Sequence, residues 1–177
     1  MNLLDYFKTK TFDFVNYVHL TEDESRAIWK GRNHPDVRKW MTDPNPFSWE
    51  SHLSYIESLK NKTDRSYWAV FYDNNVVGSM CLNPIGTTLP DYYNRNDNVV
   101  ERKWAETGMF MLPQYIGKGL GTQIKKEFVD YILDETDIEL LLLKTQHNNI
   151  RVIQLNESLG YKVFNKDDIY VYMLRTK

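Results

Sequence analysis

Three glycines stand at alternate positions, 117, 119 and 121, within the ten-residue segment Pro113 to Thr122. The residues before this segment predict a strand and those after it predict a helix, so the glycines occupy the connection between them. Glycine adopts backbone conformations that are closed to other residues and lets a ligand approach the chain closely. The amides at a helix start point outward, with the positive end of the helix dipole behind them. The segment therefore predicts an anion site that suits a phosphate group.

Two common classes of phosphate site do not match this segment. It is not a P-loop, which ends in lysine followed by serine or threonine, and it lacks the Gly-x-Gly-x-x-Gly spacing with a ribose-binding acid. We therefore disfavour a nucleoside triphosphatase and a Rossmann dehydrogenase. A glycine turn that only packs a helix against a strand is the alternative.

Two motifs in this order resemble the GNAT family of N-acetyltransferases. Gln114-x-x-Gly117-x-Gly119 is similar to the pyrophosphate-binding signature of that family, and it has a predicted strand before it and a predicted helix after it. Asn149 stands eleven residues before the pair Gly160-Tyr161, which is similar to a second hallmark of the family. The resemblance extends over essentially the whole chain.

The resemblance implies that acetyl-CoA is the cosubstrate and lies in a V-shaped opening between the strand that ends at Leu112 and the strand that contains Leu140 to Leu143. Backbone groups of the first strand would pair with the pantetheine arm, and the glycine segment would hold the pyrophosphate. No metal is expected, since the sequence has no spaced His, Cys and Asp cluster. The residues assigned to acetyl-CoA are Phe110, Met111, Leu112, Gln114, Ile116, Gly117, Lys118, Gly119, Leu120, Gly121, Thr122, Asn149 and Asn156.

In this family the acetyl group passes directly to an amine, which requires a deprotonated acceptor, a polarised carbonyl and a stabilised thiolate. Glu106 precedes the cofactor strand where several relatives place a base, so we predict that it is the general base; a solvated acid is the alternative. Relatives often protonate the thiolate with a Tyr at the position of Asn156, or use a Ser at the position of Val152. Neither residue here can act as that acid, which leaves Tyr161, Tyr115 or water.

The acceptor site is expected in the N-terminal helices. There the pattern from Trp29 to Met41, followed by Ser48 to Ile56, resembles a branch that includes the ribosomal-protein N-terminal acetyltransferases and the acetyltransferase of pseudaminic acid biosynthesis, which acts on a UDP-linked amino sugar. Arg32 and Arg38 would bind phosphate, although surface ion pairs are the alternative for both. His52 would be a base with a pKa near neutrality, although a hydrogen-bonded structural histidine is the alternative. The predicted substrate-binding residues are Arg32, Asn33, Trp40 and His52.

The resulting hypothesis is an acetyl-CoA-dependent N-acetyltransferase that acts on a primary amine of a small molecule, with an amino sugar nucleotide favoured. The rival acceptors are a protein N-terminus and an aminoglycoside. A third hypothesis is a non-catalytic acyl-CoA-binding module, which Asn156 at the usual acid position favours.

Composition restricts the remaining possibilities. The 177 residues include 22 Lys and Arg against 24 Asp and Glu, for a net charge of −2, so no basic field favours nucleic acid. The single Cys81 lies in an apolar run and is expected to be an inert thiol in a reducing cytoplasm. No apolar stretch approaches the ~20 residues of a membrane span. We expect one domain over residues 1–177, as a monomer or homodimer.

The predicted elements form an α/β fold: a mixed, largely antiparallel sheet with a V-shaped split between two central strands, flanked by about four helices. The first 60 residues are predicted to be mostly helical, with caps at Thr21 and Ser48 and a break at 31–35. A hairpin follows, and 84–98 is predicted to be a long loop. The remaining predicted strands are 107–112, 139–145, 161–164 and 169–174, and the remaining predicted helices are 118–134 and 149–159.

Overall fold

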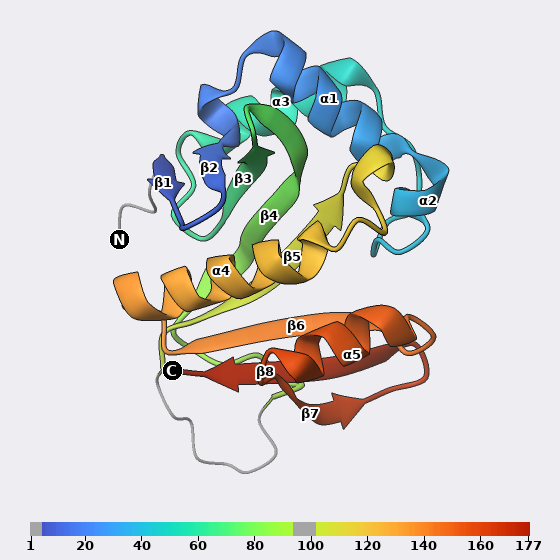
Figure 1. The fold of residues 1–177 in the computed structure, drawn as a ribbon. Coiled ribbons are helices and arrows are strands. Elements are labelled where there is room, and N and C mark those ends of the chain that lie inside the picture. The colour runs from blue at the N-terminus through green and yellow to red at the C-terminus, as the bar shows by residue number, and fades with distance from the viewer. Residues whose placement is uncertain (1–4, 94–101) are drawn as a thin grey trace.

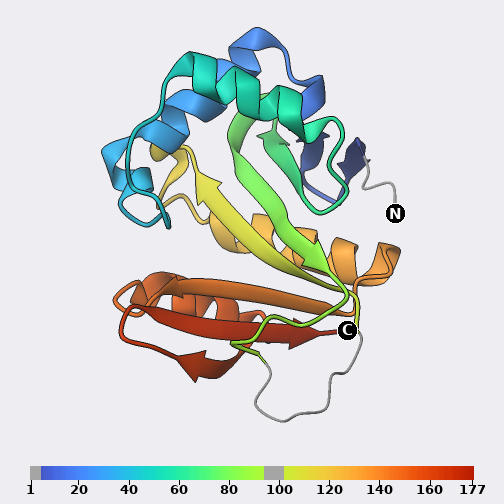
Figure 2. The ribbon, with the colours of Figure 1, turned by 180° about the vertical axis from the view of Figure 1, so that it is seen from behind.

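The computed structural model describes residues 5–93 and 102–177 as a single twisted sheet of eight strands flanked by helices (Figures 1 and 2). The strand order is β1-β2-β3-β4-β5-β6-β8-β7. Its elements are β1 Tyr6–Lys8, β2 Asp13–Asn16, η1 Tyr17–His19, α1 Glu22–Asn33, α2 Pro35–Arg38, α3 Trp49–Leu59, β3 Ser66–Tyr72, β4 Asn75–Gly86, β5 Trp104–Met111, η2 Pro113–Tyr115, α4 Leu120–Glu135, β6 Leu140–Gln146, α5 Ile150–Ser158, β7 Lys162–Lys166 and β8 Tyr170–Thr176.

The sheet is antiparallel except between its two central strands, β5 and β6. These strands pair in parallel over only three residues, from Trp104 opposite Leu140 to Glu106 opposite Leu142. Beyond that point β5 continues to Met111 and β6 to Gln146, and the two ribbons diverge (Figure 1). The predicted mixed sheet with a split between two central strands is therefore confirmed.

Helices cover both faces of the sheet. α4 and α5 lie on one face, where Ile124 and Phe128 pack with Ala105 and Leu141 in the main core. α1 and α3 lie over β3 to β5 on the other face, where Ile28 and Leu59 pack in a second cluster (Figures 1 and 2). Successive residues of β5 consequently face different helices, because strand side chains alternate between the two faces of a sheet.

Local sequence explains most element boundaries. Thr21 and Glu24 form a reciprocal capping box at the start of α1, and the Ser48 hydroxyl accepts the Ser51 amide at the start of α3. Asp73 and Asn74 take positive φ angles of 47° and 59° in the turn of the β3–β4 hairpin. Both predicted caps and the predicted hairpin are therefore confirmed.

Three sequence predictions about the elements were wrong or incomplete. The N-terminal part contains the strands β1 and β2, which were not predicted. Their buried aromatic residues are Phe7 and Phe14, and the buried Phe12 lies between the two strands. The predicted break at 31–35 begins only at His34, three residues after Gly31. Gly31 lies within α1, and its lack of a side chain leaves room for Leu112. β4 extends through Gly86 into the predicted loop 84–98, whose last part lies outside the described residues.

Candidate active site

The fork between β5 and β6 is the centre of the site. Glu106 is the last residue of β5 that pairs with β6, so its side chain lies where the two strands separate. It lies on the same face of β5 as Trp104, and its Oε2 accepts a hydrogen bond of 3.0 Å from the Tyr92 hydroxyl. Burial raises the pKa of Glu106, an effect that Lys144 and the Tyr92 hydrogen bond oppose. A carboxyl whose pKa moves toward neutrality suits a general base.

The glycine segment lies beyond the end of β5 and leads into α4. Gly117 and Gly119 have positive φ angles of 84° and 82°, and Gly119 is the N-cap of α4. A Cβ atom built at either glycine meets no other atom within 4 Å. The segment therefore leaves open space beside outward-facing amides at a helix start, which fits the pyrophosphate of acetyl-CoA.

The other residues predicted for acetyl-CoA surround the two arms of the split. Phe110, Met111 and Leu112 end the β5 arm, where the ladder to β6 has already stopped. Asn149 is the N-cap of α5, and its amide donates to the Gln146 carbonyl at the end of the β6 arm. The exposed residues of the glycine segment are Gln114, Ile116, Gly117, Lys118, Gly119 and Thr122, while Leu120 and Gly121 are half-buried.

Asn156 is buried in α5 with one side-chain atom unsatisfied. Its Nδ2 donates to the Val152 carbonyl at 2.8 Å, but its Oδ1 has no hydrogen-bond partner among the described residues. A buried acceptor without a donor is costly in a folded protein. The open acceptor fits a ligand that brings a donor, such as the amides of a pantetheine arm.

A buried polar cluster that the sequence analysis missed lies on the α4 side of the fork. Lys125 Nζ donates to Thr107 Oγ1 at 2.6 Å, and Thr107 Oγ1 donates to the Leu142 carbonyl at 3.2 Å. The Tyr161 hydroxyl lies 3.5 Å from the same Thr107 oxygen. Spacing was the available signal, because Lys125 precedes the buried Val129 by four residues, which places it on the buried face of α4.

Arg32 and Asn33 end α1 beside the β5 arm, because Gly31 packs against Leu112 and Phe110. Asn33 uses both ends of its amide on the Phe47 backbone, at 2.9 and 3.0 Å, which fixes the loop after α2. Arg32 Nη2 donates to the Asp43 carbonyl at 3.1 Å, whereas its buried Nη1 has no partner among the described residues.

The same loop region also contacts the β6 arm. The Gln146 side chain donates to the Lys39 carbonyl at 3.2 Å, so the segment after α2 contacts the β6 arm while α1 lies beside the β5 arm. Trp40 follows α2 with 40% of its surface exposed. Arg38 donates to the Pro44 carbonyl at 2.8 Å and forms no ion pair among the described residues.

His52 is buried and Cys81 is half-buried. His52 Nε2 lies 3.1 Å from Ser25 Oγ between α3 and α1, its ring packs against Trp49, and burial lowers its pKa. This placement favours the structural alternative for His52. Burial raises the pKa of Cys81 to about 12, which agrees with an inert thiol.

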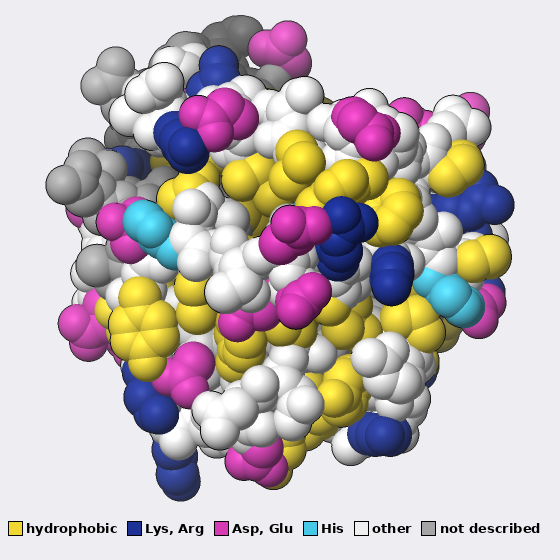
Figure 3. All heavy atoms as spheres, turned by 90° about the horizontal axis from the view of Figure 1, so that it is seen from above, with side chains coloured by type: hydrophobic (Ala, Val, Ile, Leu, Met, Phe, Trp, Pro, Cys, Tyr) yellow, Lys and Arg dark blue, Asp and Glu magenta, His cyan; other side chains and the backbone are white. Residues whose placement is uncertain are grey.

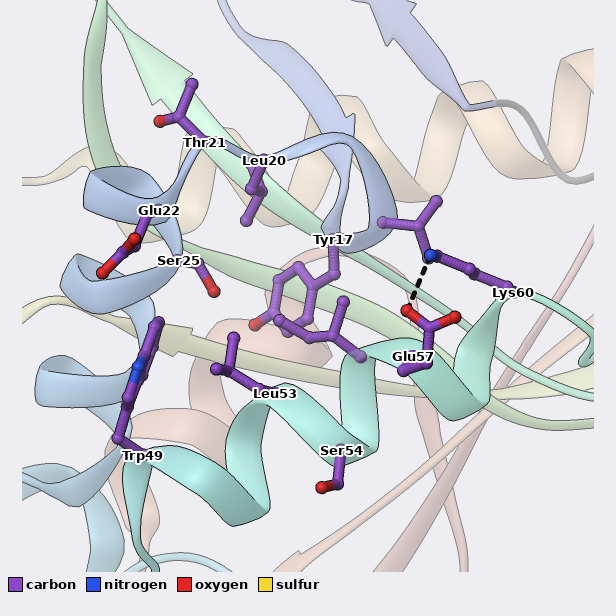
Figure 4. Close-up of a pocket in the computed structure, with 12 residues that line it drawn as sticks. Tyr17, Leu20, Thr21, Glu22, Ser25, Trp49, Leu53, Ser54, Glu57 and Lys60 are labelled. Carbon is purple, nitrogen blue, oxygen red and sulfur yellow. Dashed lines mark ion pairs between the residues drawn. The ribbon is translucent and has the colours of Figure 1, made fainter.

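A groove of about 760 Å³ lies apart from the fork, between η1, α1 and α3. In Figure 4, Leu20, Tyr17 and Leu53 lie between the two helices, and Glu57 pairs with Lys60 at one end. Viewed from above, the molecule shows hydrophobic side chains in patches among acidic and basic ones (Figure 3). None of the predicted substrate residues lines this groove.

Two further findings concern metals and membranes. The described residues contain no group of three or more His, Cys, Asp and Glu side chains that could hold a metal ion. None of the described helices is both long enough and apolar enough to cross a membrane.

Comparison with known proteins identifies a common family. The sequence model of the Acetyltransferase (GNAT) family matches residues 34–161. The chain is 23% identical to acetyltransferase PseH of Campylobacter jejuni over 158 residues, and this alignment covers 89% of each chain. The crystal structure of that organism's N-acetyltransferase PseH with acetyl coenzyme A matches at a TM-score of 0.71 and 18% identity, covering 94% of this chain and 99% of that one. The structure of RimL, a ribosomal L7/L12 α-N-protein acetyltransferase in complex with coenzyme A, matches at a TM-score of 0.74 and 12% identity, covering 97% of each chain.

Proposed function

The chain belongs to the GNAT family of acetyltransferases, and we propose that it transfers the acetyl group of acetyl-CoA to the primary amine of a small anionic molecule, an amino sugar nucleotide. The predictions of the family, of its branch and of acetyl-CoA as the acetyl donor are confirmed. The acceptor and the roles of individual residues are the parts that we propose.

The buried Nη1 of Arg32 carries the acceptor proposal. Burial lowers the pKa of Arg32, yet a guanidinium stays charged at neutral pH. A buried guanidinium nitrogen without an acceptor calls for an anionic partner, because an unsatisfied buried charge is costly. Arg32 lies beside the β5 arm on the face that Glu106 shares, so an anionic substrate held there would bring its amine toward the fork. The branch resemblance implies an acceptor of this kind, an amino sugar on a diphosphate.

In the reaction that we propose, Glu106 takes a proton from the acceptor amine. Its raised pKa makes it a stronger base than an exposed carboxylate, and the Tyr92 hydroxyl holds its Oε2 in place. Gly117, Gly119 and Gly121 hold the pyrophosphate, and the β5 backbone beyond the fork holds the pantetheine arm. Bound there, acetyl-CoA supplies the activated acyl group.

We further propose that residues 1–177 act as one domain, because one sheet connects β1 to β8. We place the enzyme in the cytoplasm, as a monomer or homodimer, since its single cysteine is a free, half-buried thiol suited to a reducing setting.

A panel of acceptors tests the proposal. Turnover is measured by release of free thiol with a UDP-linked amino sugar, the same amino sugar without the nucleotide, a peptide with a free N-terminus and an aminoglycoside. We expect the nucleotide-linked sugar to have the highest kcat/KM. Arg32→Gln should raise its KM about 10-fold or more, as the loss of a charged hydrogen bond predicts. Arg26→Gln is the control, because Arg26 also lies on α1 but forms an ion pair with Glu22.

Other outcomes would overturn specific parts. Turnover of the peptide or the aminoglycoside without turnover of the sugar would overturn the proposed acceptor and identify one of its rivals instead. Binding of acetyl-CoA without turnover of any amine would favour the non-catalytic module.

A further inference from the structure

Lys125 is a buried cation without a carboxylate partner among the described residues. Only 3% of its surface is exposed, and its single hydrogen bond goes to Thr107 Oγ1. The other groups that face it are neutral: the Tyr161 ring centroid lies 5.5 Å from its Nζ, and burial keeps the Cys81 thiol protonated. Such burial is costly for an ammonium group.

Burial lowers the pKa of Lys125 to about 7. The amine can therefore hold or release a proton near neutral pH, as a general acid must. A side chain that served only packing would not need an amine, because an apolar side chain of similar volume fills a buried site without loss of stability.

The position of Lys125 relates it to the reaction. Thr107 is the first residue of β5 beyond the ladder, and its hydrogen bond to the Leu142 carbonyl connects the two arms at the fork. Thr107 faces α4, the helix that begins at the glycine segment, whereas Glu106 faces the opposite side of the sheet with Tyr92. A direct transfer needs one group that takes the proton of the incoming amine and a separate group that gives a proton to the departing sulfur, and the two faces of the fork offer one of each.

The usual acid of the family is missing from this chain. Asn156 occupies its position and has no acidic proton to give. Tyr161 is buried within the same cluster, and burial raises its pKa above the ordinary range of a phenol. Among the groups of the cluster, Lys125 gives up a proton most readily at neutral pH.

We propose that Lys125, acting through the Thr107 hydroxyl, supplies the proton that the leaving sulfur takes up. This inference depends on the proposed function. As the carbon–sulfur bond breaks and the carbon–nitrogen bond forms, Thr107 turns its hydroxyl from the Leu142 carbonyl and gives its proton to the sulfur. Thr107 Oγ1 takes a proton from Lys125 in return, and Glu106 takes the proton of the amine. After CoA leaves, a proton from solvent returns to Lys125 through the Thr107 hydroxyl, and Glu106 loses its proton to solvent.

The test is the ionisation of bound CoA, followed by the ultraviolet absorbance of its thiolate. In the wild type, the Lys125 ammonium should stabilise the thiolate, so bound CoA should ionise about 10-fold more readily than free CoA, which is one pKa unit. Lys125→Met should remove this difference and Thr107→Val should reduce it, and both should lower kcat about 10²-fold, the lower end for general acid catalysis. Lys126→Met is the matched control, because Lys126 is the next residue of α4 and pairs with Asp130 at the surface.

The outcomes separate this inference from the proposed function. Equal thiolate absorbance in the wild type and in Lys125→Met, with CoA bound to both, overturns the inference and leaves the proposed function intact. Absence of CoA binding to the wild type overturns the proposed function itself. If Lys125→Met does not fold, Thr107→Val decides by the same measurement.

Discussion

Glu106 and Thr107, consecutive residues of β5, place their side chains on opposite faces of the sheet at the point where the β5–β6 ladder ends. Glu106 accepts a hydrogen bond from Tyr92 on one face, and Thr107 accepts one from Lys125 on the other. The alternation of a strand therefore separates a base from an ammonium group across the fork. This arrangement suits a reaction in which one proton leaves an amine and another reaches a sulfur.

Replacement of Glu106 by Gln should lower kcat about 10²-fold to 10⁴-fold, because Gln cannot accept the proton of the amine. The base is active only when deprotonated, and its pKa is raised. The wild-type rate should therefore rise with pH up to a point above the usual range of a carboxyl, and Glu106→Gln should lose this rise. A kcat profile against pH checks both effects.

Glu157→Gln, on the exposed side of α5, is the control and should leave the profile unchanged. A loss of only a few-fold in Glu106→Gln would show that Glu106 has a structural role.

Substitution of Gly119 by Asp should abolish binding of CoA and leave the fold intact. The new carboxylate would enter the open space beside the amides at the start of α4 and repel a pyrophosphate. Isothermal titration with CoA measures the loss. Gly160→Asp is a matched control, because Gly160 also has a φ of 84° and no atom within 4 Å of a built Cβ. Unchanged affinity in Gly119→Asp would refute the assigned loop.

Much of the fold and of the cofactor site could be predicted because local sequence determines them. The caps at Thr21 and Ser48 and the turn at Asp73 and Asn74 depend on contacts within a few residues. The glycine segment is likewise a local pattern between one strand and one helix. The predicted fork followed from the family resemblance, and the pairing of Glu106 with Leu142 confirms it.

Other features depend on contacts between distant residues, which one sequence does not reveal. β1 and β2 are only three and four residues long, and they are strands because β3 pairs with β2. Gly31 has a low helix propensity, yet it lies in α1, where its lack of a side chain lets the helix approach Leu112. The contact of Lys125 with Thr107 spans 18 positions and joins a helix to a strand.

Replacement of Asn156 by Leu should weaken binding of CoA about 10-fold, the cost of one hydrogen bond of roughly 1.4 kcal/mol. The reason is the buried Oδ1, which has no partner among the described residues and would accept a donor from the ligand. The free energy of unfolding without ligand should not fall, since Leu removes an unsatisfied buried acceptor. Titration calorimetry and urea unfolding measure the two quantities. Gln154→Leu, exposed on the same helix, is the control, and equal affinity in both variants would contradict the assignment.

Replacement of Lys125 by Met should stabilise the folded protein, and the gain should depend on pH. The pKa of this amine is about 7 in the folded protein and about 10.4 in an unfolded chain. Between these values the unfolded chain binds more protons, so the wild-type free energy of unfolding rises with pH. Below pH 7 both states are protonated, and the wild type bears the full cost of the buried charge.

The melting temperature of Lys125→Met should therefore exceed that of the wild type by roughly 5 °C or more below neutral pH. The difference should shrink as pH rises toward about 10, where the amine becomes neutral in the unfolded chain as well as in the folded protein. Differential scanning calorimetry over this pH range, with Lys126→Met as a control of nearly constant offset, measures it. A Lys125→Met variant that is less stable than the wild type at every pH would mean that packing of the lysine, rather than its charge, determines its contribution to stability.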